Sequence, residues 1–347
     1  MTVVALRGFA LDLAAPLSTA AGDIENRTGV LVRVDLDGTT GIGEATPLPA
    51  WTESATECRA ALRRARDEGI PPGAETPAAR HAVTLAYRDA FARRAGRSVA
   101  ASLAQDTAPA SVPANATVGD GSVDETVASA ATAVETGYRT VKLKVGTRSI
   151  DEDLRRVRAV ADAVDEPRSG DEAVSLRVDA NGAWDHGTAR EAVAAFDGLV
   201  EYVEQPLPAD DLAGHAALRG VGAPIAVDES LARYGIGEVV SADAADAVVL
   251  KPMALGGPSR ALAAGCAAAH VGIDPVVTTT VDAAVARTAA VHVAAALPGG
   301  GERAHGLATG GLLADDIVAT DPVPVENGRI GVPAGPGLAG DAFGGVV

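Results

Sequence analysis

Lysine occurs at only three positions of this 347-residue chain, although lysine and arginine together number 29. Lys142 and Lys144 stand two residues apart in "VKLKVG", and Lys251 follows the apolar run "DAVVL". Arginine stays protonated in proteins, whereas a lysine whose pKa is lowered can accept a proton. We therefore expect proton-transfer chemistry at these lysines, with a second ammonium and a nearby dication lowering a lysine pKa from about 10.4 toward 7–8.

Three acidic residues end apolar runs in the chain between the lysines. Asp179 ends "SLRVD", Glu204 ends "VEYVE" and Asp228 ends "PIAVD". One carboxylate after a strand is commonly a helix N-cap, but three converging carboxylates repel one another unless a cation binds them. Oxygen ligands with room for water suit Mg²⁺, with Mn²⁺ as the alternative. A dication with a lysine on either side suits removal of a proton next to a carboxylate group.

A regular alternation of strands and helices positions these residues. Eight short apolar strands recur between residues 115 and 306, and the marked residues from Lys144 to Lys251 follow one another at 35, 25, 24 and 23 positions. A period of about 25 residues is that of one βα unit, so we predict an α/β fold with a (β/α)₈-type barrel. The longer first interval contains "DEPRSGDEAV", which we interpret as an inserted acidic loop.

The barrel geometry brings the marked residues together. Charged residues that end parallel barrel strands lie at the mouth where active sites of this architecture are built. If "ANATV" is the first strand, Lys142 and Lys144 are on the second and Lys251 is on the sixth, which puts them on opposite walls. Because side chains two apart on a strand share a face, both lysines of the pair point into the mouth.

The residues on either side of the barrel predict a second domain. Residues 2–13 and 28–37 have strand patterns with a turn at "DLDGTTG", and two helical patterns follow with Thr52 and Thr76 as N-caps. We predict an α+β capping domain in 1–105, the barrel in 106–320 and a C-terminal segment, 321–347, that returns to the capping domain. We expect "SLAQDTAPASVP" to link the first two.

Composition excludes several functions. Forty-six acidic residues give a formal net charge of −17, which argues against nucleic acid and anionic membranes as partners. An acidic chain with almost no lysine is expected of a halophile, although a GC-rich genome has a similar effect. No secretory signal or membrane-spanning run is predicted, so we expect a cytoplasmic protein. Cys58 and Cys266 lack metal-type spacing and are interpreted as free thiols. The oligomeric state is not predicted.

These motifs resemble the enolase superfamily, and within it the muconate-lactonizing branch. "VKLKVG" is similar to its Lys-x-Lys motif, "LRVDANGAW", "VEQPL" and "AVDES" to its three metal-ligand strands, and "VVLKPMALGG" to its sixth-strand lysine. "GIGEATPLP" is similar to a capping-domain segment of that branch. The resemblance implies a modified (β/α)₈ barrel closed by an α+β capping domain, with Mg²⁺ bound by Asp179, Glu204 and Asp228.

The resemblance also implies roles for individual residues. Lys144 is expected to be the base, with Lys142 tuning it, and Lys251 is expected to stabilise an enolate or to act as the opposite acid and base. The partner is a small carboxylate, which the capping segments 16–29 and 47–54 are expected to select. The candidate substrate contacts are Asn181, Arg177, Trp51 and Thr279.

Several reactions remain open within this branch. The motifs favour a dehydratase, while racemisation by two-sided proton transfer, muconate-type cycloisomerisation and a barrel that binds metal or carboxylates without turnover are alternatives. The seventh strand, "VVTTT", lacks the His–Asp dyad of the mandelate racemase branch, and the eighth, "HGLATGG", lacks the Asp-x-Asp of dipeptide epimerases. Asp282 and Ala283 stand where a Glu-Ser-like pair is expected. His305, on the eighth strand, is assigned either to the mouth or to the scaffold.

Overall fold

An antiparallel sheet opens the fold. The structure is a computed structural model that describes residues 2–19, 22–71, 73–104, 108–164 and 173–347. The sheet has the order β1-β2-β3, with strands Thr2–Thr19, Gly22–Leu36 and Thr39–Ala45. Asp37 and Gly38 form the predicted turn with φ values of 50° and 86°, the left-handed backbone that a type I′ hairpin requires. Residues 16–19 and 22–27, which belong to the capping segment 16–29 and lie outside the two predicted strands, extend β1 and β2.

Helices α1, α2 and α3 follow the sheet and span Ala55–Glu68, Pro77–Arg94 and Val99–Leu103. The predicted N-cap Thr52 is wrong. Ser54 caps α1, because its hydroxyl accepts from the amide of Glu57 while the Glu57 carboxylate accepts from the amide of Ser54. Thr76 holds the N-cap position of α2 without a side-chain cap hydrogen bond. The Glu53 carboxylate instead accepts from two amides in the first turn of α2.

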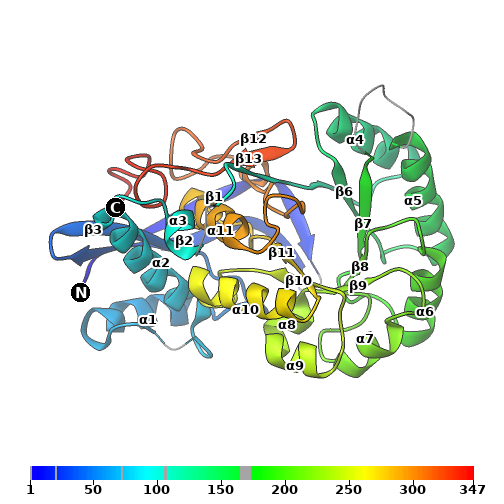
Figure 1. The fold of residues 1–347 in the computed structure, drawn as a ribbon, viewed down its shortest axis with the longest axis horizontal. Coiled ribbons are helices and arrows are strands. Elements are labelled where there is room, and N and C mark those ends of the chain that lie inside the picture. Colours follow the sequence, from blue (N-terminus) through cyan, green and yellow to red (C-terminus); the bar gives the residue numbers. More distant parts are fainter. Residues whose placement is uncertain (1, 20–21, 72, 105–107, 165–172) are drawn as a thin grey trace.

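Seven parallel strands form the predicted barrel sheet, in the order β11-β10-β9-β8-β7-β6-β5 (Figure 1). These strands are β5 Ala116–Val118, β6 Thr140–Lys144, β7 Ser175–Asp179, β8 Val203–Glu204, β9 Ile225–Val227, β10 Ala247–Leu250 and β11 Asp274–Val277. The predicted eighth strand is reduced to two parallel bridges. His305 pairs with Ala114 and Gly306 pairs with Thr278, so this segment joins both edges of the sheet.

Helices alternate with the barrel strands. They are α4 Val123–Glu135, α5 Ile150–Val164, α6 His186–Ala195, α7 Leu212–Leu218, α8 Glu229–Tyr234, α9 Ile236–Ser241, α10 Pro258–His270, α11 Ala284–Ala296 and the 3₁₀ turn Gly310–Leu312. The expected acidic insertion lies mostly at 165–172, outside the described residues. No helix in the described part of the chain is both long and apolar enough to cross a bilayer.

Alternation along β6 explains how the barrel presents charge to its interior. Val141 and Leu143 are fully buried and belong to a hydrophobic cluster with Val157 and Val160 of α5. Because side chains alternate along a strand, Lys142 and Lys144 face the opposite way, toward the barrel axis. The helix-facing residues therefore hold β6 in place while the lysines remain available at the mouth.

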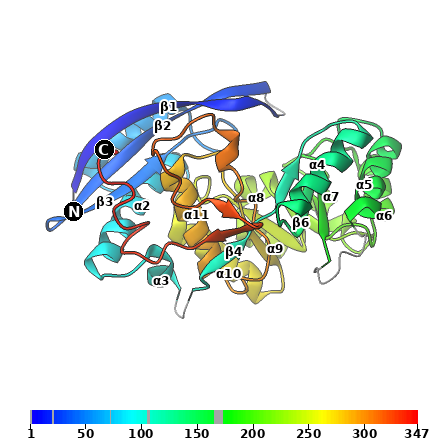
Figure 2. The same ribbon diagram turned by 90° about the horizontal axis from the view of Figure 1, so that it is seen from above.

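The last part of the chain packs against the first. A small sheet of order β12-β13-β4 joins Val325–Glu326, Arg329–Gly331 and Ser111–Pro113. Beyond it, Leu338 and Phe343 share a hydrophobic cluster with Leu31 and Ile42 of the first sheet. Buried Asp89 of α2 accepts hydrogen bonds from the amides of Ile42 and Leu338. Figure 2 shows both chain ends beside the β1-β2-β3 sheet.

Candidate active site

The strand register aligns the first wall of the site. Lys144 on β6 lies opposite Asp179 on β7, and Asp179 lies opposite Glu204 on β8. The Lys142 ammonium bridges two carboxylates, 2.8 Å from Asp179 Oδ2 and 2.7 Å from Glu204 Oε1. Lys144 Nζ lies 2.7 Å from the same Asp179 oxygen and 2.6 Å from Asn181 Oδ1. The structure thus brings together five of the residues that the sequence predicted for this site.

The second wall is formed by Lys251, which follows β10. Its ammonium forms a buried ion pair with Asp228 at the end of β9. The same ammonium lies 3.4 Å from the ring centroid of Trp51, which comes from the segment between β3 and α1. This contact brings a capping residue onto the barrel mouth and is a cation–π arrangement. Asn181 Nδ2 donates to Glu229 Oε1 at 3.2 Å, linking the two walls.

Burial and neighbouring charges set the protonation of the carboxylates. Burial alone would raise the pKa of Asp179, but the ammonium groups of Lys142 and Lys144 outweigh it and lower the pKa. Burial raises the pKa of Glu204, and the adjacent Asp179 adds to the effect. Burial also raises the pKa of Asp228 to about 8, against the opposing charge of Lys251. The carboxylates at the ends of β8 and β9 are therefore short of positive charge.

Two carboxylates determine the charge of Lys142. Burial works against the ammonium, but Asp179 and Glu204 outweigh that effect and raise the pKa of Lys142 well above its usual value. The two carboxylates in direct contact therefore keep Lys142 protonated. The lowered lysine pKa that we expect concerns the base of the pair, and it stays a prediction.

The donor set fits a dication that prefers oxygen. Asp179, Glu204 and Asp228 are at most 5% exposed and end adjacent strands. Among the described residues, no three His, Cys, Asp or Glu side chains are arranged as a ready metal site. The three carboxylates instead contact the ammonium groups of Lys142, Lys144 and Lys251. Asp228 Oδ1 and Glu229 Oε2 are buried without a hydrogen-bond partner. Unpaired buried carboxylate oxygens are what a cation would satisfy.

Gln205 supports this site and was missed in the sequence. Its backbone is left-handed, with φ 42°, and its side chain is fully buried. Gln205 Oε1 accepts from the amides of Asp228 and Ser230, at 3.0 and 3.2 Å, while Nε2 donates to Ser230 Oγ and to the Leu207 carbonyl. The side chain thus ties the ends of β8 and β9 together. Its position next to Glu204 in "VEQPL" was the available signal.

Thr279 lies beyond the carboxyl end of β11, the strand next to that of Lys251. It is 5% exposed, and its hydroxyl lies 2.9 Å from the hydroxyl of Thr309. The same oxygen accepts from the amide of Val281 at 3.2 Å. The structure therefore places Thr279 at the barrel mouth, on the far side of Lys251 from the carboxylates.

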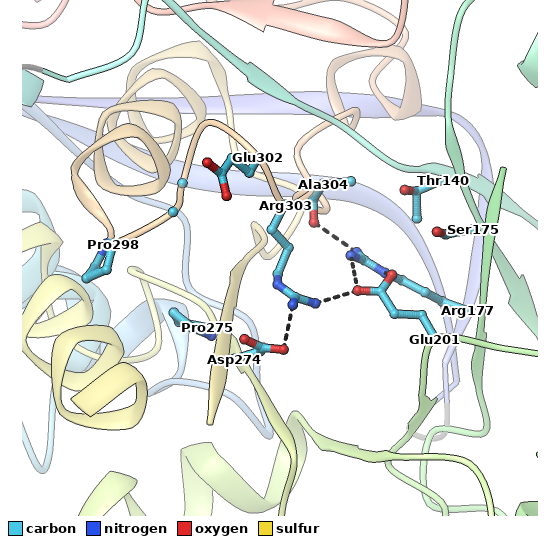
Figure 3. Close-up of a pocket in the computed structure, with 12 residues that line it drawn as sticks. Thr140, Ser175, Arg177, Glu201, Asp274, Pro275, Pro298, Glu302, Arg303 and Ala304 are labelled. Atoms are coloured by element: carbon cyan, nitrogen blue, oxygen red, sulfur yellow. Dashed lines mark hydrogen bonds and ion pairs between the residues drawn. The ribbon is translucent and has the colours of Figure 1, made fainter. Parts of the chain in front are cut away.

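Arg177 is not brought to this cluster. It lies opposite Lys142 in the strand register, two residues before Asp179, and its guanidinium donates to Glu201 and to the Ala304 carbonyl. This group lines a cavity of about 340 Å³, and Figure 3 shows the Arg303 side chain reaching Glu201 there as well. First residues of β6, β7 and β11 line the cavity, so it opens at the opposite end of the barrel. The structure places Arg177 with the scaffold.

His305 also belongs to the scaffold. Its Nδ1 accepts from the amide of Val277, and its Nε2 lies 3.2 Å from the Gly300 carbonyl, to which it donates. Burial lowers the pKa of His305 to about 3, which keeps the ring neutral. The residue thus closes the barrel between β11 and the segment before β5, and it does not face the mouth.

Comparison with known proteins identifies the family. Residues 125–341 match the family described as "Enolase C-terminal domain-like", and the chain belongs to this family. It is 42% identical over 199 residues to an o-succinylbenzoate synthase of Mycolicibacterium smegmatis, and 40% identical over 220 residues to one of Thermobifida fusca. The matches cover 55% and 62% of this chain, and 56% and 65% of those relatives. The aligned part is therefore less than two thirds of each relative.

A solved structure resembles nearly the whole chain. The dipeptide epimerase of Enterococcus faecalis V583, complexed with Mg and the dipeptide L-Leu-L-Tyr, has a TM-score of 0.85 and 26% identity, and the match covers 98% of this chain and 99% of that one. The predicted fold, an enolase-type barrel with an N-terminal capping domain, is confirmed.

Proposed function

We propose that this protein is an o-succinylbenzoate synthase, which dehydrates 2-succinyl-6-hydroxy-2,4-cyclohexadiene-1-carboxylate in menaquinone biosynthesis. The observation that carries the proposal is the pair of lysine walls around Asp179, Glu204 and Asp228. Identities of 40–42% to proteins of that name support the choice of substrate. We also propose that the capping domain ends at residue 105, that the barrel ends at residue 320, and that the protein is cytoplasmic.

Lys144 is the proposed base because it is the most accessible of the lysines. Its side chain is 34% exposed, compared with 16% for Lys142 and 10% for Lys251. Lys144 takes the proton from the carbon next to the substrate carboxylate and returns it to the hydroxyl group, which leaves as water. Lys142 stays protonated between Asp179 and Glu204, and it supplies positive charge beside the base.

Lys251 supplies positive charge from the opposite wall. Its contact with the Trp51 ring holds the ammonium at the mouth, where it would lie over the substrate ring. Asp179, Glu204 and Asp228 would hold Mg²⁺, and the bound ion would supply positive charge for the substrate carboxylate as the proton leaves. Proton transfer by a positioned side chain contributes only about 10²–10⁴-fold, so this charge must account for much of the remaining rate.

Racemisation of N-succinylamino acids is the second candidate. Lys144 and Lys251 come from opposite walls, and two-sided proton transfer requires that arrangement. A muconate-type cycloisomerase would use the same residues. Dipeptide epimerisation is disfavoured, because the eighth strand reads "HGLATGG" without an Asp-x-Asp. A barrel that only binds carboxylates or metal would have no need for lysines on both walls, since arginine would serve.

The test is turnover of the cyclohexadiene substrate, followed by ultraviolet absorbance with Mg²⁺ in molar KCl. We expect rapid loss of the diene that EDTA abolishes. A folded, Mg²⁺-binding sample that leaves the diene intact would refute the synthase assignment. Exchange of the α-proton of N-succinylamino acids in D₂O would then test the racemase.

A further inference from the structure

Val281 has a strained backbone at the barrel mouth. It lies four residues beyond the end of β11, is 9% exposed and has φ 58°. A β-branched residue rarely adopts this left-handed region, because its Cβ crowds the backbone. Such strain persists only where the surrounding contacts hold it. The turn after β11 must therefore be held by other parts of the molecule.

Arg27 of β2 makes that contact. The side chain is 4% exposed, and each of its three nitrogens donates to a main-chain carbonyl. Nε lies 3.2 Å from Val281, Nη1 3.2 Å from Pro47 and Nη2 2.8 Å from Thr46. Val281 belongs to the barrel, whereas Thr46 and Pro47 follow β3 of the N-terminal sheet. A planar guanidinium can serve several acceptors in fixed directions, which a lysine ammonium does not match.

Two acidic residues lie beside the clamp, which consists of the three hydrogen bonds from Arg27 to the carbonyls of Val281, Pro47 and Thr46. Burial lowers the pKa of Arg27, and the nearby carboxylates of Asp282 and Glu44 offset part of that effect. Glu44 also accepts from the amides of Ala283 and Ala286, at 2.9 and 2.8 Å. The N-terminal sheet thus holds the carbonyl of Val281 through Arg27 and the start of α11 through Glu44.

The clamp connects the two segments that face the mouth from either side. On the barrel side, the Val281 amide donates to the Thr279 hydroxyl. On the capping side, the Pro47 segment continues into a turn in which the Trp51 amide donates to the Leu48 carbonyl at 3.0 Å. The Trp51 ring then lies against Lys251. A shift at Arg27 would move Trp51 and Thr279 relative to each other.

We propose that Arg27 is a positioning residue that sets the distance between Trp51 and Thr279, and thereby determines which substrate fits. This inference rests on the proposed function, because it assigns both Trp51 and Thr279 to the substrate pocket. Arg27 makes none of the described contacts with the three lysines or with the carboxylates of Asp179, Glu204 and Asp228. Its loss should therefore act on substrate binding more than on the chemical step.

The test compares Arg27→Met, Val281→Gly and the double variant with Arg33→Met as the matched control. Arg33 lies on the same strand, and its exposed guanidinium donates to the Val347 carbonyl, away from the barrel mouth. We expect KM of Arg27→Met to rise about tenfold with kcat within about threefold, and Arg33→Met to match the wild type. Glycine adopts φ > 0 without strain, so in the Val281→Gly background the same change should raise KM less than about threefold.

Hydrogen exchange gives a readout that does not need turnover. The amides of Val281, Ala283 and Ala286 should exchange at least about tenfold faster in Arg27→Met than in Arg33→Met, because the clamp no longer holds the turn. If Arg27→Met does not fold, Arg27→Lys is measured in the same way. Unchanged exchange, an unchanged KM, or an equal KM effect with and without Val281→Gly overturns the proposal. Absence of diene turnover in the wild type refutes only the proposed function.

Discussion

Lys144→Arg separates charge from proton transfer at the proposed base. Lys144 Nζ contacts Asp179 at 2.7 Å and Asn181 at 2.6 Å. Arginine keeps a positive charge beside Asp179 but cannot lose its proton. The pair of cations that lowers the pKa of Asp179 is thus retained, and only the ability to accept a proton disappears.

The expected loss follows from the residues that remain. A positioned base contributes about 10²–10⁴-fold, or about 2.7–5.4 kcal/mol of transition-state stabilisation. Neither partner of Lys144 can replace it, since Asp179 has a lowered pKa and Asn181 is not a base. We therefore expect the loss of kcat to lie in the upper half of this range, at about 10³-fold or more.

The assay measures diene loss and Mg²⁺ binding on the same sample. Titration calorimetry should give a Kd for Mg²⁺ within about threefold of the wild type. Arg148→Lys is the control, because Arg148 pairs with Asp120 near the surface and takes no part in the site. It should leave turnover unchanged. If Lys144→Arg turns over within about threefold of the wild type while binding Mg²⁺ normally, our assignment of the base is wrong.

Three further predictions concern the scaffold. Burial lowers the pKa of His292 to about 4 and of His305 to about 3. The stability that each neutral ring contributes is complete above about pH 6.5, and about 2 kcal/mol of it should be lost by pH 5. The raised pKa of Asp228 acts in the opposite direction but is common to the wild type and His292→Gln, so between pH 7.5 and 5 the wild type should lose about 2 kcal/mol more free energy of unfolding in urea than His292→Gln; an equal pH dependence of the two proteins would contradict this. Gln205→Leu leaves two buried amides without their acceptor and should weaken Mg²⁺ binding about tenfold by calorimetry; an unchanged Kd would refute its supporting role. Arg177→Met removes the hydrogen bonds of a buried guanidinium to Glu201, which keeps Arg303, and to the Ala304 carbonyl, so it should lower the free energy of unfolding by about 2 kcal/mol and leave KM unchanged. A raised KM would restore Arg177 as a substrate contact.

The positions of the ionisable groups at the mouth were predictable because they follow from strand periodicity. Val141 and Leu143 commit β6 to packing against α5, which leaves Lys142 and Lys144 on the inner face. The spacing of Asp179 and Glu204 placed them at the ends of adjacent strands. These inferences need only the local pattern and the rule that parallel strands end at one edge.

The supporting residues could not be predicted in the same way. Arg27 bonds to a carbonyl 254 positions away, and nothing near it in the sequence indicates that acceptor. Arg177 carries the inward-facing pattern of Asp179, but a side chain two residues earlier on the strand meets Glu201 instead of the mouth. Periodicity specifies the face of a strand, while the partner depends on tertiary contacts.

The contacts between cations and carboxylates at the two ends of the barrel explain why lysine occurs at the mouth of a barrel whose other cations are arginines. At the amino ends of the strands, Arg177 contacts both carboxylate oxygens of Glu201, and Arg303 reaches Glu201 as well. A planar guanidinium can form two hydrogen bonds with one carboxylate in this arrangement, and the contact requires no change in protonation. At the carboxyl ends, Lys142 serves two carboxylates with one ammonium. A compact cation suits the Lys142 position, and the proposed base Lys144 needs a side chain that can exchange its proton; arginine provides neither property.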